Sequence, residues 1–138
     1  MQRRGTMDSL TIGELARLVG STTEAIRYYE RLGIVEEAPR NSSGYRQYPV
    51  RVIDELRLLK AAQALGFSLE SIGRILALTR REPVSCRPIC NLVGERIAEI
   101  DTRIEELKRA RNRLAAAVAA CDDADACVVA EHLTSVSP

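Results

Sequence analysis

The sequence predicts a mainly α-helical protein, in which a winged helix-turn-helix domain precedes one long helix and a short C-terminal loop. Of its 138 residues 46% are hydrophobic, but with one Phe and no Trp the core must be built from Leu, Ile, Val and Ala, which favours helices. Two short amphipathic segments separated by a glycine-containing turn are typical of a helix-turn-helix. An apolar pattern with alternating spacings of three and four residues then continues for more than four heptads, as in a long packed helix.

The helix-turn-helix is expected in residues 11–33. Thr11 is a candidate N-cap for a first helix, and Gly20 ends the pattern. Residues 21–24 (STTE) are a cluster of cap residues that begins a second helix, which Gly33 closes as the glycine after the helix end.

A wing and two further helices are expected next. Residues 34–50 are rich in Pro, Asn, Ser and Gly, which indicates a loop whose flanks form a small β wing. Residues 50–63 and 69–79 both have the pattern of an amphipathic helix. Gly66 is expected to end the first helix, and Ser68 is expected to cap the second. This pair packs on the first two helices to close a domain of roughly 70 residues.

The longest regular segment follows a linker at residues 79–88, whose two prolines resist helix continuation. It extends over roughly residues 88–120, and its apolar steps form a heptad pattern, the apolar seam: Cys90, Val93, Ile97, Ile100, Ile104, Leu107, Arg111, Leu114, Val118 and Cys121. Arg111 is the one polar interruption. A helix about 50 Å long exceeds a domain of about 12 Å radius, so its partner is expected to be a helix of a second copy rather than its own domain.

Composition limits the compartment and the class of partner. No apolar run approaches the roughly 20 residues that span a bilayer, and the basic start leads into no signal-peptide core, with Met7 a possible natural start. Four cysteines without an export signal indicate a reducing, cytoplasmic setting and metal-binding, reactive or buried thiols. Residues 1–80 carry 12 basic and 9 acidic side chains, whereas residues 81–138 carry 8 and 10. This difference in net charge is weak support for an N-terminal half that faces a nucleic acid.

Arginine and tyrosine cluster on the second helix and the wing. All four tyrosines lie between positions 28 and 48, beside arginines, in IRYYE (Arg27, Tyr28, Tyr29) and GYRQY (Tyr45, Arg46, Tyr48). Such side chains suit phosphate contacts, and an arginine in a groove reads a guanine edge. The alternative is that the tyrosines are half-buried core aromatics, and the helical spacing requires one of the first three side chains to pack inward.

These residues carry a resemblance. TIGELA, AIRYYERLGI, the R-x-x-x-GYRQY wing and the following AQALGFSLESI segment resemble, in order and spacing, the N-terminal domain of the MerR family of transcriptional regulators, over about residues 10–78. The resemblance implies three regions: a DNA-binding domain at 9–79, a linker and antiparallel coiled-coil dimerisation helix at 80–120, and a metal-binding loop and tail at 121–138. By position in the motifs it implies DNA contacts from Arg27, Tyr28, Tyr45 and Arg46, a phosphate contact from Lys60, and Ser21, Thr22 and Thr23 at the start of the recognition helix.

The thiols pose a geometric question. Cys86 and Cys121 lie at opposite ends of the long helix, about 50 Å apart, whereas sulfurs bind a metal at about 2.3 Å. One chain therefore cannot place both on one ion. If two such helices pair antiparallel, Cys86 of one chain meets Cys121 and Cys127 of the other, twice per dimer, and the resemblance to metal-responsive members agrees. The alternative makes Cys86 a linker residue and the other two small apolar tail residues.

Three thiolates favour soft or borderline ions. The resemblance associates a cysteine at the start of the dimerisation helix with sensors of divalent ions (Hg, Cd, Pb or Zn), and a serine with sensors of copper-group ions, so Cys86 argues against Cu(I). Cys90 lies one turn past Cys86 and either supplies a fourth sulfur or fills the apolar seam, the second being favoured. The loop CDDADAC is shorter than expected of mercury sensors, and His132 is expected to be a solvated tail residue.

The expected function is a cytoplasmic, nucleoid-associated, metal-responsive regulator. The resemblance implies a homodimer on double-stranded DNA at a palindromic promoter operator, acting with RNA polymerase: it represses without metal and activates by DNA distortion with metal. Alternatives are a thiol or redox switch on the same DNA-binding module, and a zinc-stabilised coiled-coil adaptor, which leaves the Arg/Tyr cluster unexplained. An enzyme is disfavoured because one His and no nucleophile–base pair are present.

Overall fold

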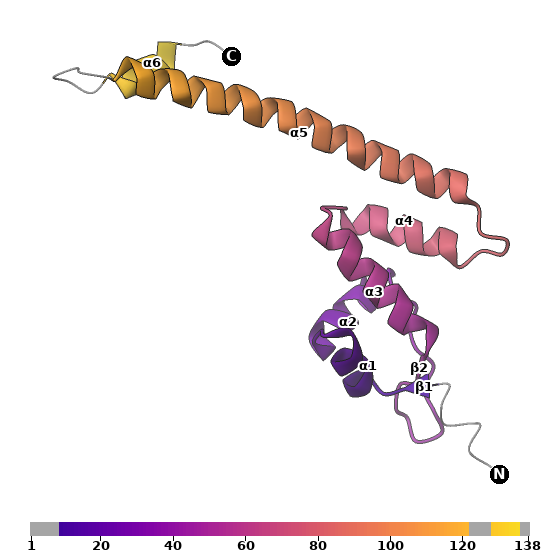
Figure 1. Ribbon diagram of the computed structural model, residues 1–138. Helices are drawn as coiled ribbons and strands as arrows, with labels where there is room; N and C mark the ends of the chain where they lie inside the picture. The colour runs from indigo at the N-terminus through magenta and orange to yellow at the C-terminus, as the bar shows by residue number, and fades with distance from the viewer. Residues whose placement is uncertain (1–8, 122–127, 136–138) are drawn as a thin grey trace. The chain divides into compact units, whose positions relative to one another are not determined.

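The computed structural model describes residues 9–121 and 128–135 and is mainly helical, as expected (Figure 1). It forms two compact units, the first extending to Leu92 and the second beginning at Val93. The elements are, in order, β1 (Ser9–Leu10), α1 (Ile12–Val19), α2 (Thr23–Arg31), β2 (Tyr48–Pro49), α3 (Arg51–Ala64), α4 (Leu69–Thr79), α5 (Cys86–Ala120) and α6 (Val129–Ser135).

The helix ends follow the cap residues of the sequence. The Thr11 hydroxyl accepts a bond from the Glu14 amide at 3.2 Å, and the Glu14 carboxylate accepts one from the Thr11 amide at 2.9 Å, so both members of a capping box are present. Hydrogen bonding of the Glu14 carboxylate to the Thr11 amide, and then to the Thr11 side chain, lowers the pKa of the exposed Glu14. Gly20 ends α1 with φ 64°, a left-handed conformation that glycine adopts without a side-chain clash. α2 begins at the N-cap Thr22, whose hydroxyl accepts from the Ala25 amide at 3.1 Å.

Two apolar clusters hold the first unit together. The larger joins α1, α2, the segment after α2, β2 and the start of α3, through residues that include Leu15, Ile26, Val35, Tyr48 and Leu56. The smaller joins α3 to α4 through Ile34, Leu59, Ala62, Ile72 and Leu76. Tyr29 packs against both clusters, so the two helix pairs form one domain, as the sequence indicated.

The wing (residues 39–49) is a small antiparallel structure. Arg40 pairs with Arg46 in an isolated bridge, and the amide of Gln47 donates to the carbonyl of Pro39 at 2.8 Å. At its tip the Asn41 side chain accepts from the amides of Ser43 and Tyr45, each at 3.0 Å. The wing returns as β2, which pairs with β1, placing Leu10 opposite Tyr48. The segment before α1 thus contributes a strand that the sequence did not indicate.

A partly buried ion pair joins the end of α4 to α3. Arg80, just after α4, donates from Nε and Nη2 to the two carboxylate oxygens of Glu55 on α3, both at 2.9 Å. Its Nη2 also donates to the carbonyl of Ile34 at 2.8 Å. Bonding to Glu55 raises the pKa of Arg80. The chain leaving α4 is therefore tied to α3 and to the segment after α2.

The long helix begins earlier than its prolines suggested. We expected a linker to residue 88, but α5 begins at Cys86 and includes Pro88 in its first turn. Proline is tolerated there because the first amides of a helix have no intrahelical acceptor. The region expected to hold a metal-binding loop and tail contains a helix that was not predicted, α6, and Arg113 of α5 donates to the carbonyl of Leu133 there at 2.9 Å. None of the described helices combines the length and the apolarity needed to cross a membrane.

Candidate nucleic-acid interface and thiol ligands

Helix α2 divides its adjacent Arg and Tyr residues between two faces. Arg27 and Tyr28 are exposed, the latter at 45%, and the guanidinium carbon of Arg31 lies 5.9 Å from the centre of the Tyr28 ring. Tyr29 turns inward to the two apolar clusters and donates to the side-chain oxygen of Gln63 at 3.4 Å. Tyr29 is therefore the member that packs inward, and Arg27 and Tyr28 remain available to a ligand.

A groove lies between α2 and the wing. This wing groove has a volume of about 290 Å³ and is lined by Thr11, Ile12, Arg27, Arg40, Gly44, Tyr45 and Arg46. It brings together three of the predicted DNA-contacting residues: Arg27, Tyr45 and Arg46. Tyr45 is 70% exposed, which excludes a core role for it. Three guanidinium groups around one groove provide the positive charge and the donors that phosphates and base edges require.

Arg40, the first residue of the R-x-x-x-GYRQY motif, also belongs to this groove, although it is not among the predicted DNA contacts. It donates to the carbonyl of Gly44 at 2.8 Å, across the wing tip, and Gly44 adopts φ 83° there. The signal for it is the antiparallel pairing of the wing, which sets Arg40 opposite Arg46. Because Gly44 and Tyr45 lie at the turn between Arg40 and Arg46, the hairpin presents both guanidinium groups to the wing groove.

A buried carboxylate joins the wing to α2. The side chain of Glu30 is only 4% exposed, and it accepts bonds from the guanidinium of Arg46 and the hydroxyl of Tyr48. The Tyr48 hydroxyl and then Glu30 raise the pKa of Arg46. Burial and then Glu30 raise the pKa of Tyr48. Tyr48 is fully buried, so for this tyrosine the core interpretation is correct, and Arg46 divides its donors between Glu30 and the wing groove.

The remaining predicted DNA-contacting residues lie around the turn between α1 and α2. Thr22 is the N-cap of α2, with Ser21 and Thr23 on either side of it and partly exposed. The ammonium of Lys60, on α3, donates to the carbonyls of Val19 and Gly20 at 3.0 and 2.7 Å. Two of its three donors thus bind carbonyls at the C-terminal end of α1, a stabilising contact in addition to the predicted phosphate contact.

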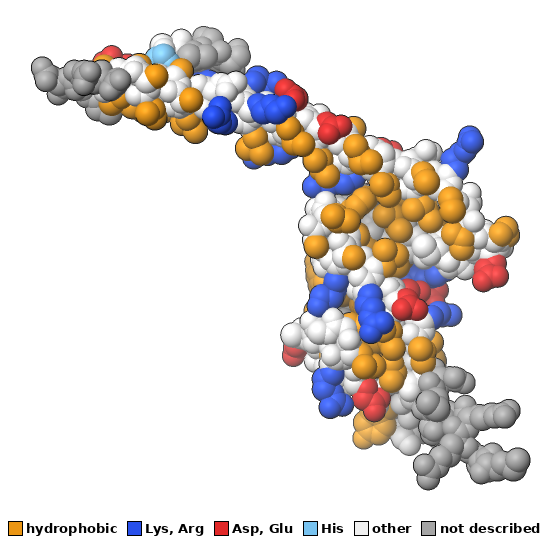
Figure 2. Space-filling model, viewed as in Figure 1, with side chains coloured by type: hydrophobic (Ala, Val, Ile, Leu, Met, Phe, Trp, Pro, Cys, Tyr) orange, Lys and Arg blue, Asp and Glu red, His pale blue; other side chains and the backbone are white. Residues whose placement is uncertain are grey.

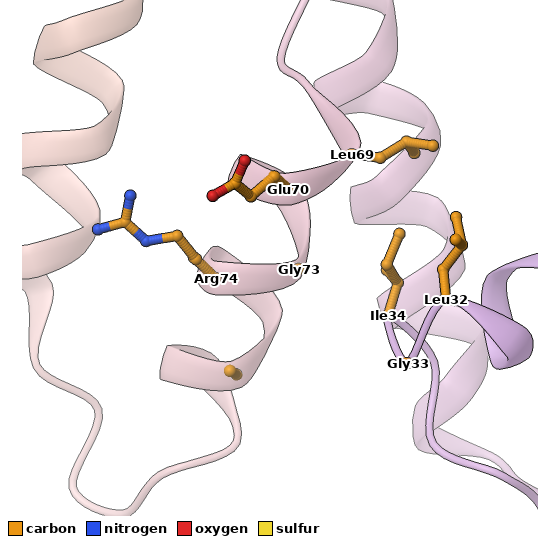
Figure 3. Close-up of a pocket in the computed structure, with 8 residues that line it drawn as sticks. Leu32, Gly33, Ile34, Leu69, Glu70, Gly73 and Arg74 are labelled. Atoms are coloured by element: carbon orange, nitrogen blue, oxygen red, sulfur yellow. The ribbon is translucent and has the colours of Figure 1, made fainter.

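A second pocket of the first unit contains none of the predicted residues. It has a volume of about 480 Å³ and lies between the segment after α2 and α4. Figure 3 shows Leu32 and Ile34 on one side, with Glu70 and Arg74 of α4 pointing away from them. Its lining is mainly apolar and differs in chemistry from the cationic wing groove.

The described thiols lie at the two ends of α5. Cys86 is its first residue and Cys90 follows one turn later, both exposed, while Cys121 directly follows its last residue and is half-buried. Cys127 lies outside the described residues. Within residues 9–121 and 128–135, no three His, Cys, Asp or Glu side chains come together as a set that could hold a metal ion. His132, expected to be a solvated tail residue, lies in α6 and is half-buried.

The apolar seam of α5 lies on the surface of the chain. Its Val, Ile and Leu side chains are between 39% and 69% exposed, and Figure 2 shows hydrophobic side chains following one another along the long helix. Leu107, Arg111, Leu114 and Val118 line one shallow hollow, so Arg111 shares the face of its apolar neighbours. By contrast Ala117 is fully buried. A long apolar stripe that its own chain leaves exposed is typical of an interaction surface.

Comparison with known proteins gives two family matches. Residues 10–79 match the family described as MerR HTH family regulatory protein. Residues 53–117 match the family described as MerR, DNA binding. The two matches together extend from α1 to near the end of α5, and thus include the wing groove and most of the apolar seam.

Three individual proteins illustrate the similarity. The mercuric resistance operon regulatory protein of Bacillus cereus is 41% identical over 103 residues, which are 75% of this chain and 78% of that protein. The HTH-type transcriptional regulator CueR of Escherichia coli is 36% identical over 127 residues, covering 91% and 94% of the two chains. The structure of the transcription regulator PbrR691 from Ralstonia metallidurans CH34, in complex with lead(II), superposes with a TM-score of 0.76 at 26% identity, covering 93% of this chain and 99% of that one.

Proposed function

The chain belongs to the MerR family of helix-turn-helix transcriptional regulators, and from that premise we propose that it is a homodimeric, metal-responsive switch at a heavy-metal resistance promoter. It represses without metal and activates by distorting the DNA when a divalent thiophilic ion binds thiols shared between protomers. The ligands are Cys86 of one protomer and Cys121 and Cys127 of the other, giving two sites per dimer.

One observation supports the shared site most directly: α5 is a single helix of 35 residues with a cysteine at its first position and another directly after its last. Such a helix is about 52 Å long, far more than one ion can bridge between sulfurs bound at about 2.3 Å. Two copies of α5 in antiparallel order bring opposite ends together. The exposed apolar seam supplies the surface on which they pair.

The donor set fits a soft or borderline divalent ion. Cys86 and Cys121 are accessible in the chain, and thiolates bind Hg, Cd, Pb and Zn well. Two of the similar proteins carry mercury and lead in their descriptions. Binding such an ion deprotonates the thiols and crosslinks the two protomers at the end of each helix, so the bound dimer differs from the free one in charge and in freedom of movement.

The wing groove and the exposed face of α2 are the proposed DNA-binding surface. Arg27, Arg40 and Tyr45 supply donors to phosphates and base edges, with Arg46 held beside them by Glu30. Tyr28 and the turn residues Ser21, Thr22 and Thr23 extend this surface, and Lys60 uses its third donor on a phosphate. Two such surfaces in a two-fold dimer fit the two halves of a palindromic operator.

The switch is a change of angle between the two DNA-binding domains of the dimer. An ion that binds one arrangement of the helix ends more tightly than the other shifts the population of the dimer by that difference in affinity. On an operator whose promoter elements are out of phase for RNA polymerase, the resulting twist corrects the phase. The protein acts in the cytoplasm, on the nucleoid.

The shared site is tested by metal titration of the full-length reduced protein, followed by thiolate-to-metal absorption. Cys86→Ser and Cys121→Ser homodimers are each expected to lose the absorption of the site. A mixed dimer of the two variants contains one complete site and one site that lacks both Cys86 and Cys121. It is therefore expected to recover half of the wild-type absorption. Recovery of none would contradict the cross-chain site.

A transcription assay on the operator with Hg, Cd, Pb and Zn then identifies the inducer. The alternative, a thiol or redox switch, predicts activation by an oxidant such as diamide in the presence of a chelator, and no response to metal under reducing conditions. Arg27→Ala serves as the DNA-binding control, because it leaves the thiols intact and is expected to weaken operator binding by about 1–3 kcal/mol with or without metal.

A further inference from the structure

We propose that Asp101 of each protomer pairs with Lys108 and Arg111 of the partner subunit, and that these charges set the direction and the register of the α5 dimer. The inference rests on the proposed homodimer and deepens it. It assigns a role to charges on α5 that neither the DNA-binding surface nor the thiols use.

The apolar seam is symmetric along its own length. Its ten positions are spaced alternately by three and four residues about a point midway between Ile104 and Leu107. A two-fold axis through that point sets Ile104 opposite Leu107 of the partner subunit and Ile97 opposite Leu114 of the partner subunit. All ten seam positions are then paired, whereas a shift by one heptad in either direction leaves positions at the ends unpaired.

Opposite charges meet beside the seam in this register. Asp101 and Lys108 each follow an apolar seam residue, and the symmetry that pairs Ile104 with Leu107 places Asp101 across from Lys108 of the partner subunit, twice per dimer. Asp101 is exposed and makes no ion pair with any described residue of its own chain. Lys108 lies 3.2 Å from Glu105 in a solvent-exposed pair on one helix, which is weak and leaves it able to turn.

Arg111 takes part in the same contact. It is the polar member of the seam and lies on the face of Leu107 and Leu114, where its guanidinium bonds only weakly to the Asn112 side chain at 3.4 Å. In the symmetric register it faces Ile100 of the partner subunit, and Asp101 of the partner subunit is the next residue. A long arginine side chain keeps its stem on the apolar layer while its head reaches that carboxylate. The interruption of the heptad pattern is thereby explained.

The competing arrangements bring like charges together. A shift by one heptad in one direction sets Asp101 against its own copy and Arg103 against its own copy. The opposite shift sets Lys108 against its own copy. A parallel dimer places Arg111 against Arg111 of the partner subunit inside the seam and Arg103 beside Lys108 of the partner subunit. A parallel dimer also pairs every seam position and places Asp101 beside Arg96 of the partner subunit, so attraction at Asp101 does not by itself decide the direction. Among these arrangements, only the antiparallel symmetric register combines full apolar pairing and attraction at Asp101 with no contact between like charges at these positions.

The register also places a thiol. Cys90 and Cys121 are the first and last seam positions, so each lies opposite the other residue in the partner subunit. Cys86 is one turn from Cys90 on the same end of the helix. Cys90 thus lies beside the proposed shared thiols. A disulfide between Cys90 and Cys121 of the partner subunit would identify this register.

The charges are tested with Asp101→Lys and Lys108→Glu in the full chain, in reducing buffer with a chelator. Each homodimer then carries two like-charge contacts, and its dissociation constant, from sedimentation equilibrium, is expected to rise on the order of 10-fold. In an equimolar mixture the heterodimer has attraction at both contacts: the introduced lysine faces the introduced glutamate, and the retained Asp101 faces the retained Lys108. It is expected to bind on the order of 10-fold more tightly than either homodimer.

Each other result overturns the inference. Tighter dimerisation of Lys108→Glu alone indicates a parallel dimer, because Arg103 then gains a partner. Equal affinities for homodimers and heterodimer mean that Asp101 and Lys108 do not meet. A wild-type chain that stays monomeric overturns the proposed homodimer as well, which separates the two failures. Circular dichroism of each variant checks that the exposed substitutions leave the helices intact.

The register itself is tested by crosslinking of Cys86→Ser/Cys127→Ser, which keeps Cys90 and Cys121. Diamide accepts two electrons and two protons from the two thiols, which form a disulfide between protomers in the symmetric register. The opposite ends of one α5 cannot close this bond within a chain. Peptide mapping is expected to find Cys90 joined to Cys121, with the yield reduced in the Asp101→Lys background. Absence of that peptide in a dimer that forms overturns the register.

Discussion

The first unit buries its large apolar side chains, whereas α5 leaves most of its own exposed. The DNA-binding domain covers its Leu, Ile and Val side chains within one chain, and Leu15, Ile26 and Leu59 are fully buried. Along α5 the same residue types remain on the surface. The first unit therefore buries its apolar side chains within itself, whereas α5 has an apolar face that the described residues leave exposed.

The polar groups differ in the same sense. Glu30 and Glu55 in the first unit are buried and bonded to arginine, joining segments that are distant in sequence. The ion pairs that the structure describes along α5 join residues three positions apart on an exposed surface, for example Arg103 and Glu106 at 3.2 Å. Such local pairs stabilise a helix only slightly and define no tertiary contact. Contacts between α5 and another helix therefore depend on the exposed apolar seam and not on these ion pairs.

The largest expected effect is on the core of the first unit. Leu59→Ala removes a fully buried side chain from the smaller cluster and is expected to lower the free energy of unfolding of the domain by about 2–5 kcal/mol. Chemical denaturation followed by circular dichroism measures it. Leu58→Ala is the matched control, because Leu58 is exposed, and its effect is expected to be well under half as large.

The same substitution on α5 is expected to act on association instead. Leu107→Ala leaves the unfolding of the DNA-binding domain unchanged. It is expected to weaken dimerisation by about 1.5–3 kcal/mol per dimer, because two leucines are lost and each is 53% exposed in the free chain, so that association buries only about half of it. Sedimentation equilibrium measures the change. Arg109→Ala, on the opposite face of the helix, serves as the control, and an equal loss in both variants would contradict an interface along the apolar seam.

A smaller effect is expected at the start of α2. Thr22→Ala removes the hydroxyl that accepts the Ala25 amide at 3.1 Å, and is expected to lower the domain's stability by about 1 kcal/mol. Thr23→Ala removes a hydroxyl one position later that caps no helix, and thermal unfolding should be almost unaffected. Stability loss at Thr23 equal to that at Thr22 would contradict the cap.

The smallest effect at neutral pH concerns Tyr48. Burial and then Glu30 raise its pKa in the folded chain above the ordinary 10.0, so below pH 10 the hydroxyl is protonated in both states and contributes no pH dependence. As pH rises above 10, the unfolded state releases this proton first and stability falls. The wild type is therefore expected to lose stability relative to Tyr48→Phe only above pH 10, in denaturation curves measured at successive pH values.

Local chemistry made most of the first unit predictable. The caps Thr11 and Ser68 and the glycines at 20, 33 and 66 lie at the helix ends where the sequence placed them. These features depend on the backbone of one turn, so neighbours in sequence determine them. The tertiary contacts were less accessible, since nothing local indicates that Lys60 binds the carbonyls at the end of α1 or that β1 pairs with β2.

The misplaced start of α5 and the missed α6 have separate causes. Proline breaks a helix in its interior, but Pro88 lies in the first turn of α5, where it costs no hydrogen bond. Helix α6 has seven residues, too few for a clear apolar period, and it is held by a contact from Arg113 to Leu133. The identity of the thiol ligands stays a prediction, because it depends on contacts between two chains and on Cys127.

The buried Glu30 has a mechanical consequence. Its carboxylate is bonded to Arg46 and Tyr48, so the wing is fastened to α2 rather than hinged on it. A fastened wing cannot absorb a rotation of the domain by bending. In the proposed DNA complex, a rotation of the domain would therefore move α2 and the wing together. A single carboxylate would thus set how stiffly the protein grips its operator, and with it how much of each turn becomes twist in the DNA.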